Sequence, residues 1–291
     1  MNKLFSASSN DNTLFITERC NNRCLMCCQP PKTHDDYDYC YKKNLEIIEK
    51  SPSNIACIGL TGGEPTVAGK YLFDTLKAVR NKYPNALLHF LTNGRLFNES
   101  VLTELKKYNF ENIVFAIPLH SDFRGDHDKI TGVAGSYSDT MRGLYNLAMS
   151  NARVELRIII NAINFKRLPQ MANFIYNNLP FVEDVVFVGM EAIGKALKNV
   201  KEIWIDPLDY KAQLEDAVLI LSRWGIEVGI SNIPHCLLAK SIRCFAWKSI
   251  SDWKVYYPKF CSICKFRDEC CGVFATSKWQ SMNLRPVTGE E

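Results

Sequence analysis

The first 235 residues of this chain alternate short apolar runs with amphipathic segments, and no other feature constrains the fold as strongly. Runs such as NIVFAIPL and VELRIIINAI are almost continuously apolar and rich in Ile, Val and Leu. Such runs are typical of parallel strands that are buried on both faces. Between them, apolar side chains recur at helical spacing, for example at Leu72, Leu76, Val79 and Tyr83. The alternation of strands and helices predicts a parallel α/β architecture.

The expected strands lie at 12–17, 54–60, 87–92, 112–119, 153–161 and 184–189, with a candidate seventh at 226–230. Six or seven strand–helix units suit an incomplete or complete barrel. The pattern alone suits an open doubly wound sheet equally well.

The twelve cysteines are unevenly placed: six lie between positions 20 and 57, six between 236 and 271, and none in the long middle. The sequence shows no secretory signal segment and no apolar run long enough to span a bilayer, so we expect a cytoplasmic protein without a membrane partner. In a reducing compartment, metal ligation explains many cysteines better than disulfides do. The net charge of +4 is too small to indicate a nucleic-acid partner.

The first cysteine cluster, ERCNNRCLMCCQP, contains a C-x3-C-x2-C pattern formed by Cys20, Cys24 and Cys27. It directly follows the predicted strand TLFIT, and active sites of barrels are built at that end of a strand. Three thiolates can hold three irons of a [4Fe–4S] cube and leave the fourth iron open to a small molecule. A zinc site completed by a distant ligand is the alternative. Cys28, next to Cys27, is expected to be a bystander.

A second motif, LTGGEPT, follows the second predicted strand. Gly62 and Gly63 allow a close approach of the backbone, and Pro65 fixes the turn. Glu64 offers a carboxylate to a cationic group. Alone, this motif is weak evidence for a function. It becomes strong evidence when it follows the next strand after a C-x3-C-x2-C motif.

With both motifs, the sequence resembles the radical S-adenosylmethionine (SAM) enzymes over about residues 12–230. The resemblance implies a partial (β/α)6 TIM-type barrel with a [4Fe–4S] cluster on Cys20, Cys24 and Cys27. It also implies that the open iron chelates the amino and carboxylate groups of SAM and that residues 62–65 contact the SAM amino group. Met26 departs from the family, which usually has an aromatic residue there, but methionine can also pack on an adenine face.

Further positions match the family less tightly. Each lies at or near the end of a predicted strand and is expected near SAM or the substrate: Asn93 in LTNGRL, His120 and Ser121 in PLHSDFRGDHDKITG, Arg157 and Asn161 in the fifth strand, and Met190 or Glu191 in FVGMEAIG. An ordinary loop charge is the alternative for Glu191. His127 and Asp128 are expected to begin the next helix, with a local hydrogen-bonding role as likely an explanation as a functional one.

The second cysteine cluster is centred on CSICKFRDEC, a C-x2-C-x5-C pattern formed by Cys261, Cys264 and Cys270. With Cys236 upstream, four thiolates are enough to close one auxiliary [4Fe–4S] cluster. Cys244 competes with Cys236 for the fourth position, and Cys271 competes with Cys270. A zinc site with four cysteine ligands is the alternative.

These observations divide the chain into an N-terminal segment (1–11), a partial barrel (12–235), a cysteine-rich extension (236–275) and a polar tail (276–291) that we expect to be poorly ordered. The spacing resembles the twitch and SPASM extensions of peptide-modifying radical SAM enzymes, although Phe274 stands where the longer pattern has a cysteine. Together with SISDWKVYY, the motifs most resemble the smaller maturase of His-Xaa-Ser peptide systems.

The resemblance implies an oxidoreductase that cleaves SAM to a 5′-deoxyadenosyl radical and takes a hydrogen from a ribosomal precursor peptide. Eleven residues before the first strand are too few for a leader-binding domain. Peptide recognition would then fall to a partner, such as a second maturase or a leader-binding protein, to the barrel mouth, or to the cysteine-rich extension. A flavodoxin or ferredoxin would supply electrons. The alternatives are a glycyl-radical activase, a radical SAM enzyme acting on a small molecule or nucleotide, and a non-catalytic iron–sulfur carrier or zinc scaffold.

Overall fold

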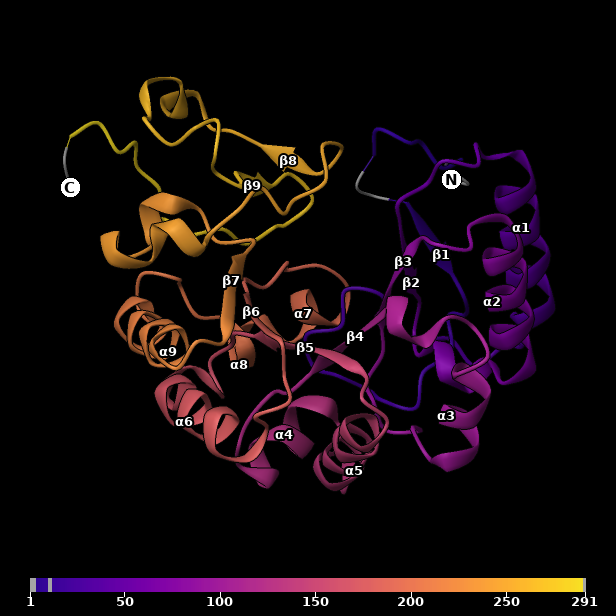
Figure 1. Ribbon diagram of the computed structural model, residues 1–291. Helices are drawn as coiled ribbons and strands as arrows, with labels where there is room; N and C mark the ends of the chain where they lie inside the picture. Colours follow the sequence, from indigo (N-terminus) through magenta and orange to yellow (C-terminus); the bar gives the residue numbers. More distant parts are fainter. Residues whose placement is uncertain (1–3, 10–11, 290–291) are drawn as a thin grey trace. The chain divides into compact units, whose positions relative to one another are not determined.

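The computed structural model describes residues 4–9 and 12–289 and contains a seven-stranded sheet (Figure 1). The strands follow one another in chain order: β1 (Thr13–Phe15), β2 (Cys57–Thr61), β3 (Leu87–Leu91), β4 (Ile113–Pro118), β5 (Arg153–Ile159), β6 (Asp184–Val188) and β7 (Glu227–Ser231). The predicted parallel α/β fold is confirmed, including the seventh strand. A doubly wound sheet reverses its strand order at a switch point. This sheet does not, so it is a partial barrel.

The chain divides into two compact units, with β5 crossing the boundary between Glu155 and Leu156. The first unit holds the chain up to Arg23 together with Gln29–Pro118 and Val133–Glu155. The second holds Cys24–Cys28, Leu119–Gly132 and the chain from Leu156 onward.

The first unit contains β1–β4 with the helices α1 (Tyr37–Lys50), α2 (Lys70–Lys82), α3 (Glu99–Leu105) and α5 (Ser136–Met149). Its strand pairs are parallel, with Leu14 opposite Leu60 and Phe90 opposite Phe115. These apolar side chains are fully buried. An aromatic cluster joins β3 and β4 to the loop that follows β3. Phe97 of this loop packs edge-on against Phe90 of β3 and Phe115 of β4. The core therefore lies between the sheet and the helices of this unit.

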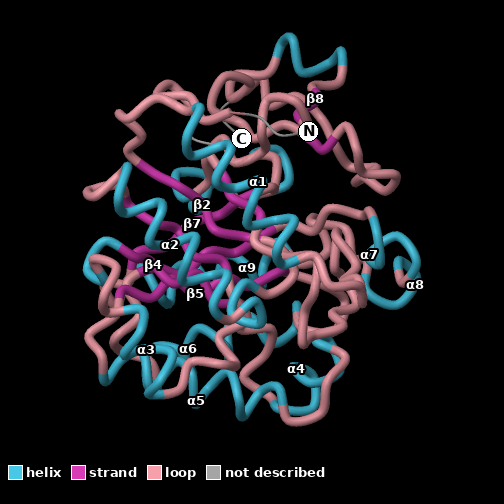
Figure 2. Tube along the Cα trace, turned by 90° about the vertical axis from the view of Figure 1, so that its right-hand side faces the viewer, coloured by secondary structure: helices cyan, strands magenta, loops and turns pink. Residues whose placement is uncertain are grey.

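The second unit contains β6 and β7 with the helices α4 (Arg124–Thr131), α6 (Leu168–Asn178), α7 (Gly194–Lys198), α8 (Val200–Ile203) and α9 (Lys211–Arg223). Helices α6 and α9 pack side by side (Figure 1), and α7 and α8 form two consecutive short turns (Figure 2). Beyond β7 the chain is mostly loop, with one antiparallel pair, β8 (Val255–Tyr256) and β9 (Val273–Phe274). Within the described residues, no helix is both long and apolar enough to cross a membrane.

Short 3-10 turns connect these elements, at Pro65–Ala68, Phe110–Asn112, Phe165–Arg167, His235–Leu237, Lys240–Phe245 and Lys259–Ile263.

The described part of the tail, 276–289, differs from the expected poorly ordered segment. The Oγ of Ser277 accepts a hydrogen bond from the Ala192 N–H at 3.1 Å. The Oγ of Ser281 donates to the Asp206 carboxylate at 2.9 Å. Val287 is buried, although its neighbours in sequence are polar. These two serine hydroxyls and the buried Val287 connect this segment to its own unit.

Candidate active site and auxiliary cysteine site

The loop after β1 carries the three cysteines predicted to bind iron. Cys20, Cys24 and Cys27 are all half-buried, whereas Cys28 is exposed. The boundary between the two units falls inside this loop, after Arg23.

The Cys20 end of the loop is held by amide and guanidinium donors of the first unit. The Asn22 N–H donates to the Cys20 sulfur at 3.3 Å. The Asn93 side chain donates to Asn21 Oδ1 at 2.6 Å and approaches the Cys20 sulfur to 4.0 Å. Donors of this kind at cysteine sulfurs raise the reduction potential of an iron–sulfur cluster. Asn93 thus lies beside the cysteine loop, while its predicted contact with SAM or the substrate stays a prediction.

Arg95 is a site residue that the sequence reasoning missed. Its guanidinium donates to the Asn21 carbonyl and to Asn22 Oδ1, both at 2.8 Å, and pairs with Asp139 of α5 at 3.0 Å. Burial alone would raise the pKa of Asp139, but hydrogen bonds from Arg95 and Arg142 outweigh burial and lower it. Arg95 therefore fixes the cysteine loop to a helix. Its place directly after the T-N-G motif was the only available signal.

The G-G-E-P segment runs against the start of the cysteine loop within the first unit. The Gly63 N–H donates to the Thr17 carbonyl at 2.7 Å, and the Glu64 N–H donates to the Arg19 carbonyl at 2.8 Å. A Cβ on Gly63 would lie 2.2 Å from the Arg19 oxygen. Gly62 has φ +143°, and a Cβ there would lie 2.4 Å from the Thr17 oxygen. Only glycine fits this close backbone approach at either position.

Glu64 is fully buried, and its carboxylate accepts only neutral donors. Oε1 accepts from the Thr66 N–H at 3.1 Å, from the Thr66 hydroxyl at 2.6 Å and from the Thr92 hydroxyl at 2.7 Å. Oε2 accepts from the Asn93 N–H at 2.6 Å. Burial raises the pKa of Glu64 despite these donors. In this structure the Glu64 carboxylate joins the segments that follow β2 and β3, and the predicted contact with a cationic group stays a prediction.

The substitution Glu64→Gln is expected to destabilise the protein by about 1–3 kcal/mol, because the amide nitrogen must face at least one of these N–H or O–H donors. Urea unfolding measures the free energy, with the exposed Glu46→Gln as the matched control. An unchanged free energy of unfolding would show that the Glu64 oxygens are not the acceptors for Thr92 and Asn93.

His120 and Ser121 lie at the end of β4, as predicted, and both are buried. The His120 N–H donates to His127 Nδ1 at 3.3 Å. Burial and the neighbouring His127 lower the pKa of His120 to about 3, so its imidazole stays neutral. The Ser121 hydroxyl accepts from the Phe123 N–H at 3.1 Å. The prediction that His127 begins a helix is wrong, because α4 starts at Arg124 and His127 faces back toward His120.

Arg157 and Asn161 lie in and just after β5. Asn161 is fully buried, and its side chain closes the turn by donating to the Ile159 carbonyl and accepting from the Ile163 N–H, both at 3.0 Å. Arg157 is half-buried, and its carbonyl accepts from the Leu119 N–H at 3.1 Å. Asn161 therefore shapes its own loop in this structure.

Met190 and Glu191 follow β6 and have different surroundings. The Glu191 side chain is 11% exposed, pairs with Lys254 at 2.9 Å and accepts a hydrogen bond from the Thr276 hydroxyl. It is thus not an ordinary loop charge, since it ties the end of β6 to the C-terminal region. Met190 packs against the buried cluster that contains Met26 and also lines a pocket.

The structure gathers four cysteines of the C-terminal region around one pocket of about 370 Å³, a volume that includes its open mouth. They are the four expected from the sequence: Cys236, Cys261, Cys264 and Cys270. Cys244 is exposed and lines a separate depression. Cys271 is buried and does not line the pocket. The geometry favours Cys236 over Cys244 and Cys270 over Cys271.

Neighbouring thiols and hydrogen-bond donors shift the pKa values of the cysteines in this pocket. Contact with the Cys271 thiol lowers the pKa of Cys270 to about 4 against the effect of burial, helped by His235 and the Gly272 N–H. Burial and the neighbouring thiols raise the pKa of Cys261 to about 11. Arg267 and Arg285 also line the pocket. A bound cation would relieve the repulsion among four thiolates, so the donor set fits a metal cluster.

Comparison with known proteins gives one family and several relatives. The family profile described as the Radical SAM superfamily matches residues 14–175. An Fe-coproporphyrin III synthase of Methanosarcina barkeri is 25% identical over 192 residues, which are 64% of this chain and 45% of that protein. A tungsten-containing aldehyde ferredoxin oxidoreductase cofactor-modifying protein of Pyrococcus furiosus is 26% identical over 172 residues, 56% of this chain and 47% of that protein. The chain spans about half the length of these relatives.

Two solved structures share the fold at low sequence identity. Streptococcus suis SuiB bound to S-adenosylmethionine has a TM-score of 0.61 and 14% identity, covering 77% of this chain and 50% of SuiB. The protein anSMEcpe with bound AdoMet and Cp18Cys peptide has a TM-score of 0.58 and 16% identity, covering 75% of this chain and 62% of that one.

Proposed function

This chain belongs to the Radical SAM superfamily, and from that membership we propose that it cleaves SAM reductively and modifies a ribosomally made precursor peptide. The observation that carries the SAM-cleaving step is the pairing of the C-x3-C-x2-C loop with a G-G-E-P segment that hydrogen-bonds to the start of that loop. When bound, a [4Fe–4S] cluster and SAM supply the electron and the 5′-deoxyadenosyl radical.

The residues of the chain then have distinct tasks. Cys20, Cys24 and Cys27 would hold the cluster, and the N–H donors at Cys20 would tune it. Gly62 and Gly63 allow the close approach to the Thr17 and Arg19 carbonyls that positions the G-G-E-P segment, which would contact the SAM amino group. Arg95 keeps the loop in place. Precise placement matters because hydrogen abstraction succeeds only when the target carbon is held close to the radical.

The C-terminal cysteines support a further part of the proposal, one auxiliary [4Fe–4S] cluster. Cys236, Cys261, Cys264 and Cys270 line a single pocket and would supply all four ligands. A cluster closed by four protein ligands favours electron transfer or a structural role over substrate binding at an open iron. Zinc, which also accepts four cysteines, is the competing metal.

Two substrate classes have support. SuiB and anSMEcpe are described with a bound precursor peptide or peptide, and both share this fold. The sequence relatives instead include a coproporphyrin synthase and a cofactor-modifying protein, which makes a tetrapyrrole or other cofactor the second candidate. We favour the peptide because of the cysteine-rich extension. A second maturase or leader-binding protein, and a flavodoxin or ferredoxin, would be its partners.

Anaerobic reconstitution tests this function. We expect about eight irons per chain, one reduced cluster whose EPR signal shifts with SAM, and formation of 5′-deoxyadenosine detected by mass spectrometry. If a precursor-peptide gene lies beside the gene for this chain, adding that peptide should change the peptide mass. A reduced protein that neither responds to SAM nor forms 5′-deoxyadenosine would overturn the SAM-cleaving function.

A further inference from the structure

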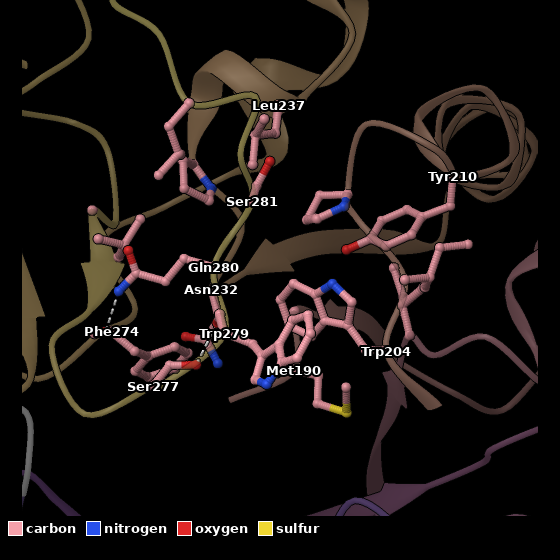
Figure 3. A pocket seen from close by; sticks show the side chains of 18 residues that line it. Met190, Trp204, Tyr210, Asn232, Leu237, Phe274, Ser277, Trp279, Gln280 and Ser281 are labelled. Carbon is pink, nitrogen blue, oxygen red and sulfur yellow. Dashed lines mark hydrogen bonds between the residues drawn. The ribbon is translucent and has the colours of Figure 1, made fainter. Parts of the chain in front are cut away.

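A pocket of about 520 Å³, including its open mouth, lies at the carboxyl ends of three strands of the second unit (Figure 3). Ile160 follows β5, Met190 follows β6 and Asn232 follows β7. Residues between Gly272 and Leu284 form the facing wall. The strand ends are where barrels place their substrates. The position alone therefore suggests a substrate pocket.

The walls of this pocket are aromatic and uncharged. The indoles of Trp204 and Trp279 lie 6.4 Å apart at 47°, and Tyr210 and Phe274 add two more rings (Figure 3). The described residues that line the pocket include no lysine, arginine, histidine, aspartate or glutamate. Aromatic walls bind flat apolar groups well, whereas a charged group buried without a partner costs several kcal/mol.

One polar group points into this pocket without a partner. Tyr210, at the start of α9, is 2% exposed, and its hydroxyl has no hydrogen bond within residues 4–9 and 12–289. Figure 3 shows that hydroxyl directed toward the indole of Trp204. Burial raises the pKa of Tyr210, so the hydroxyl stays neutral. A buried hydroxyl normally finds a partner, and in this pocket water or a polar atom of a bound molecule can provide it.

Asn232 adds a second polar feature to the mouth of the pocket. It has φ +62°, a left-handed conformation that is uncommon for residues other than glycine. Ser249 holds it there, because its hydroxyl accepts from the Asn232 N–H at 2.7 Å and donates to Oδ1 at 2.9 Å. The Nδ2 group of Asn232 is not used in these contacts and is left to donate to a neutral acceptor.

The pocket lies beside part of the cysteine loop. Met190 lines the pocket and also packs against the cluster formed by Met26, Ile130, Ala196 and Ile203, which Cys24 contacts as well. Met190 and this buried cluster therefore connect the pocket to this end of the loop.

We propose that this pocket binds a neutral aromatic side chain of the substrate, with Tyr210 hydrogen-bonded to a neutral polar atom of the same molecule. The inference rests on the proposed function for the identity of the substrate as a peptide. A carboxylated porphyrin fits the pocket poorly, because none of its lining residues is a cation that could pair with the carboxylates.

Binding of short peptides to the reconstituted holoenzyme tests this inference. The probes are acetylated, amidated tripeptides Gly-X-Gly with tryptophan, leucine or glutamate at the centre, measured by saturation-transfer NMR titration. We expect the tryptophan peptide to bind at least about 10-fold more tightly than the glutamate peptide. Tyr210→Phe should weaken it by about 2- to 10-fold, and Trp204→Ala by about 30-fold. Trp253→Ala, at an exposed tryptophan outside the pocket, should leave it unchanged.

The outcomes separate this inference from the proposed function. Equal binding of the glutamate peptide, or of hemin in a Tyr210-dependent manner, would overturn the neutral aromatic pocket. So would unchanged binding in the conservative Tyr210→Phe variant, whose iron content and circular dichroism confirm folding. SAM cleavage measured without peptide in the same preparations tests the proposed function alone: its absence, with tryptophan-peptide binding intact, would refute the enzyme and leave the pocket standing.

Discussion

Replacing Cys24 with alanine is expected to reduce SAM cleavage to background and to remove about four irons per chain, because a [4Fe–4S] cube on two thiolates is not retained. Cys28→Ala provides a matched control. It lies four positions away on the same loop, is exposed, and is not a proposed ligand. Its iron content and SAM cleavage should equal those of the unchanged protein.

The fold should survive the Cys24 substitution. The loop is anchored at its other end by Arg95, which bonds the Asn21 carbonyl and the Asn22 side chain rather than any sulfur. Far-ultraviolet circular dichroism should therefore be unchanged. Iron content measured by colorimetric assay, and 5′-deoxyadenosine by mass spectrometry, decide the result. Full SAM cleavage by Cys24→Ala, or equal loss by Cys28→Ala, would show that the ligands have been assigned wrongly.

The parallel sheet could be predicted well because each strand can be identified from residues that are adjacent in the sequence. Buried apolar residues mark the strands, continuously in most of β4 and at alternate positions in β3 and β5, and glycine-containing segments such as LTGGEPT and LTNGRL lie at strand ends. The order of strands in the sheet is not a local property. Only the structure excluded the doubly wound alternative, because β1 to β7 lie in chain order.

Side-chain partners were predicted less well because they depend on contacts between distant positions. The carboxylate of Glu64 was predicted to meet a cationic group, and the sequence did not indicate that it also accepts hydrogen bonds from Thr66, Thr92 and Asn93. No sequence motif marks the role of Arg95, although its side chain connects the cysteine loop to α5. A single sequence contains no information on which distant residues contact each other. Residues of a motif with fixed spacing can be predicted without that information.

The C-terminal cysteines show an intermediate case. Spacing predicted Cys261, Cys264 and Cys270 directly, since all three lie within ten residues. The fourth position was open between Cys236 and Cys244, which lie far upstream. The shared pocket favours Cys236, and the choice depends on where the turn after β7 directs the chain.

Cys264→Ala is expected to lower the iron content from about eight to about four per chain while SAM cleavage without peptide persists. The extension has few buried apolar residues, so its order should depend on the metal. Its loss should lower the thermal midpoint and make residues 236–289 sensitive to proteolysis. Cys244→Ala, at the exposed thiol outside the pocket, is the matched control and should retain about eight irons.

Each contrary result has a definite meaning for the auxiliary site. Equal iron loss in Cys244→Ala and Cys264→Ala, with full iron in Cys236→Ala, would move the fourth ligand to Cys244. One zinc per chain with about four irons in the unchanged protein would replace the auxiliary cluster by a four-cysteine zinc site. Zinc cannot carry an electron, so this result would also remove electron transfer from the proposed role of the extension. Neither result bears on the chemistry of the neutral aromatic pocket, because none of these cysteines lines it.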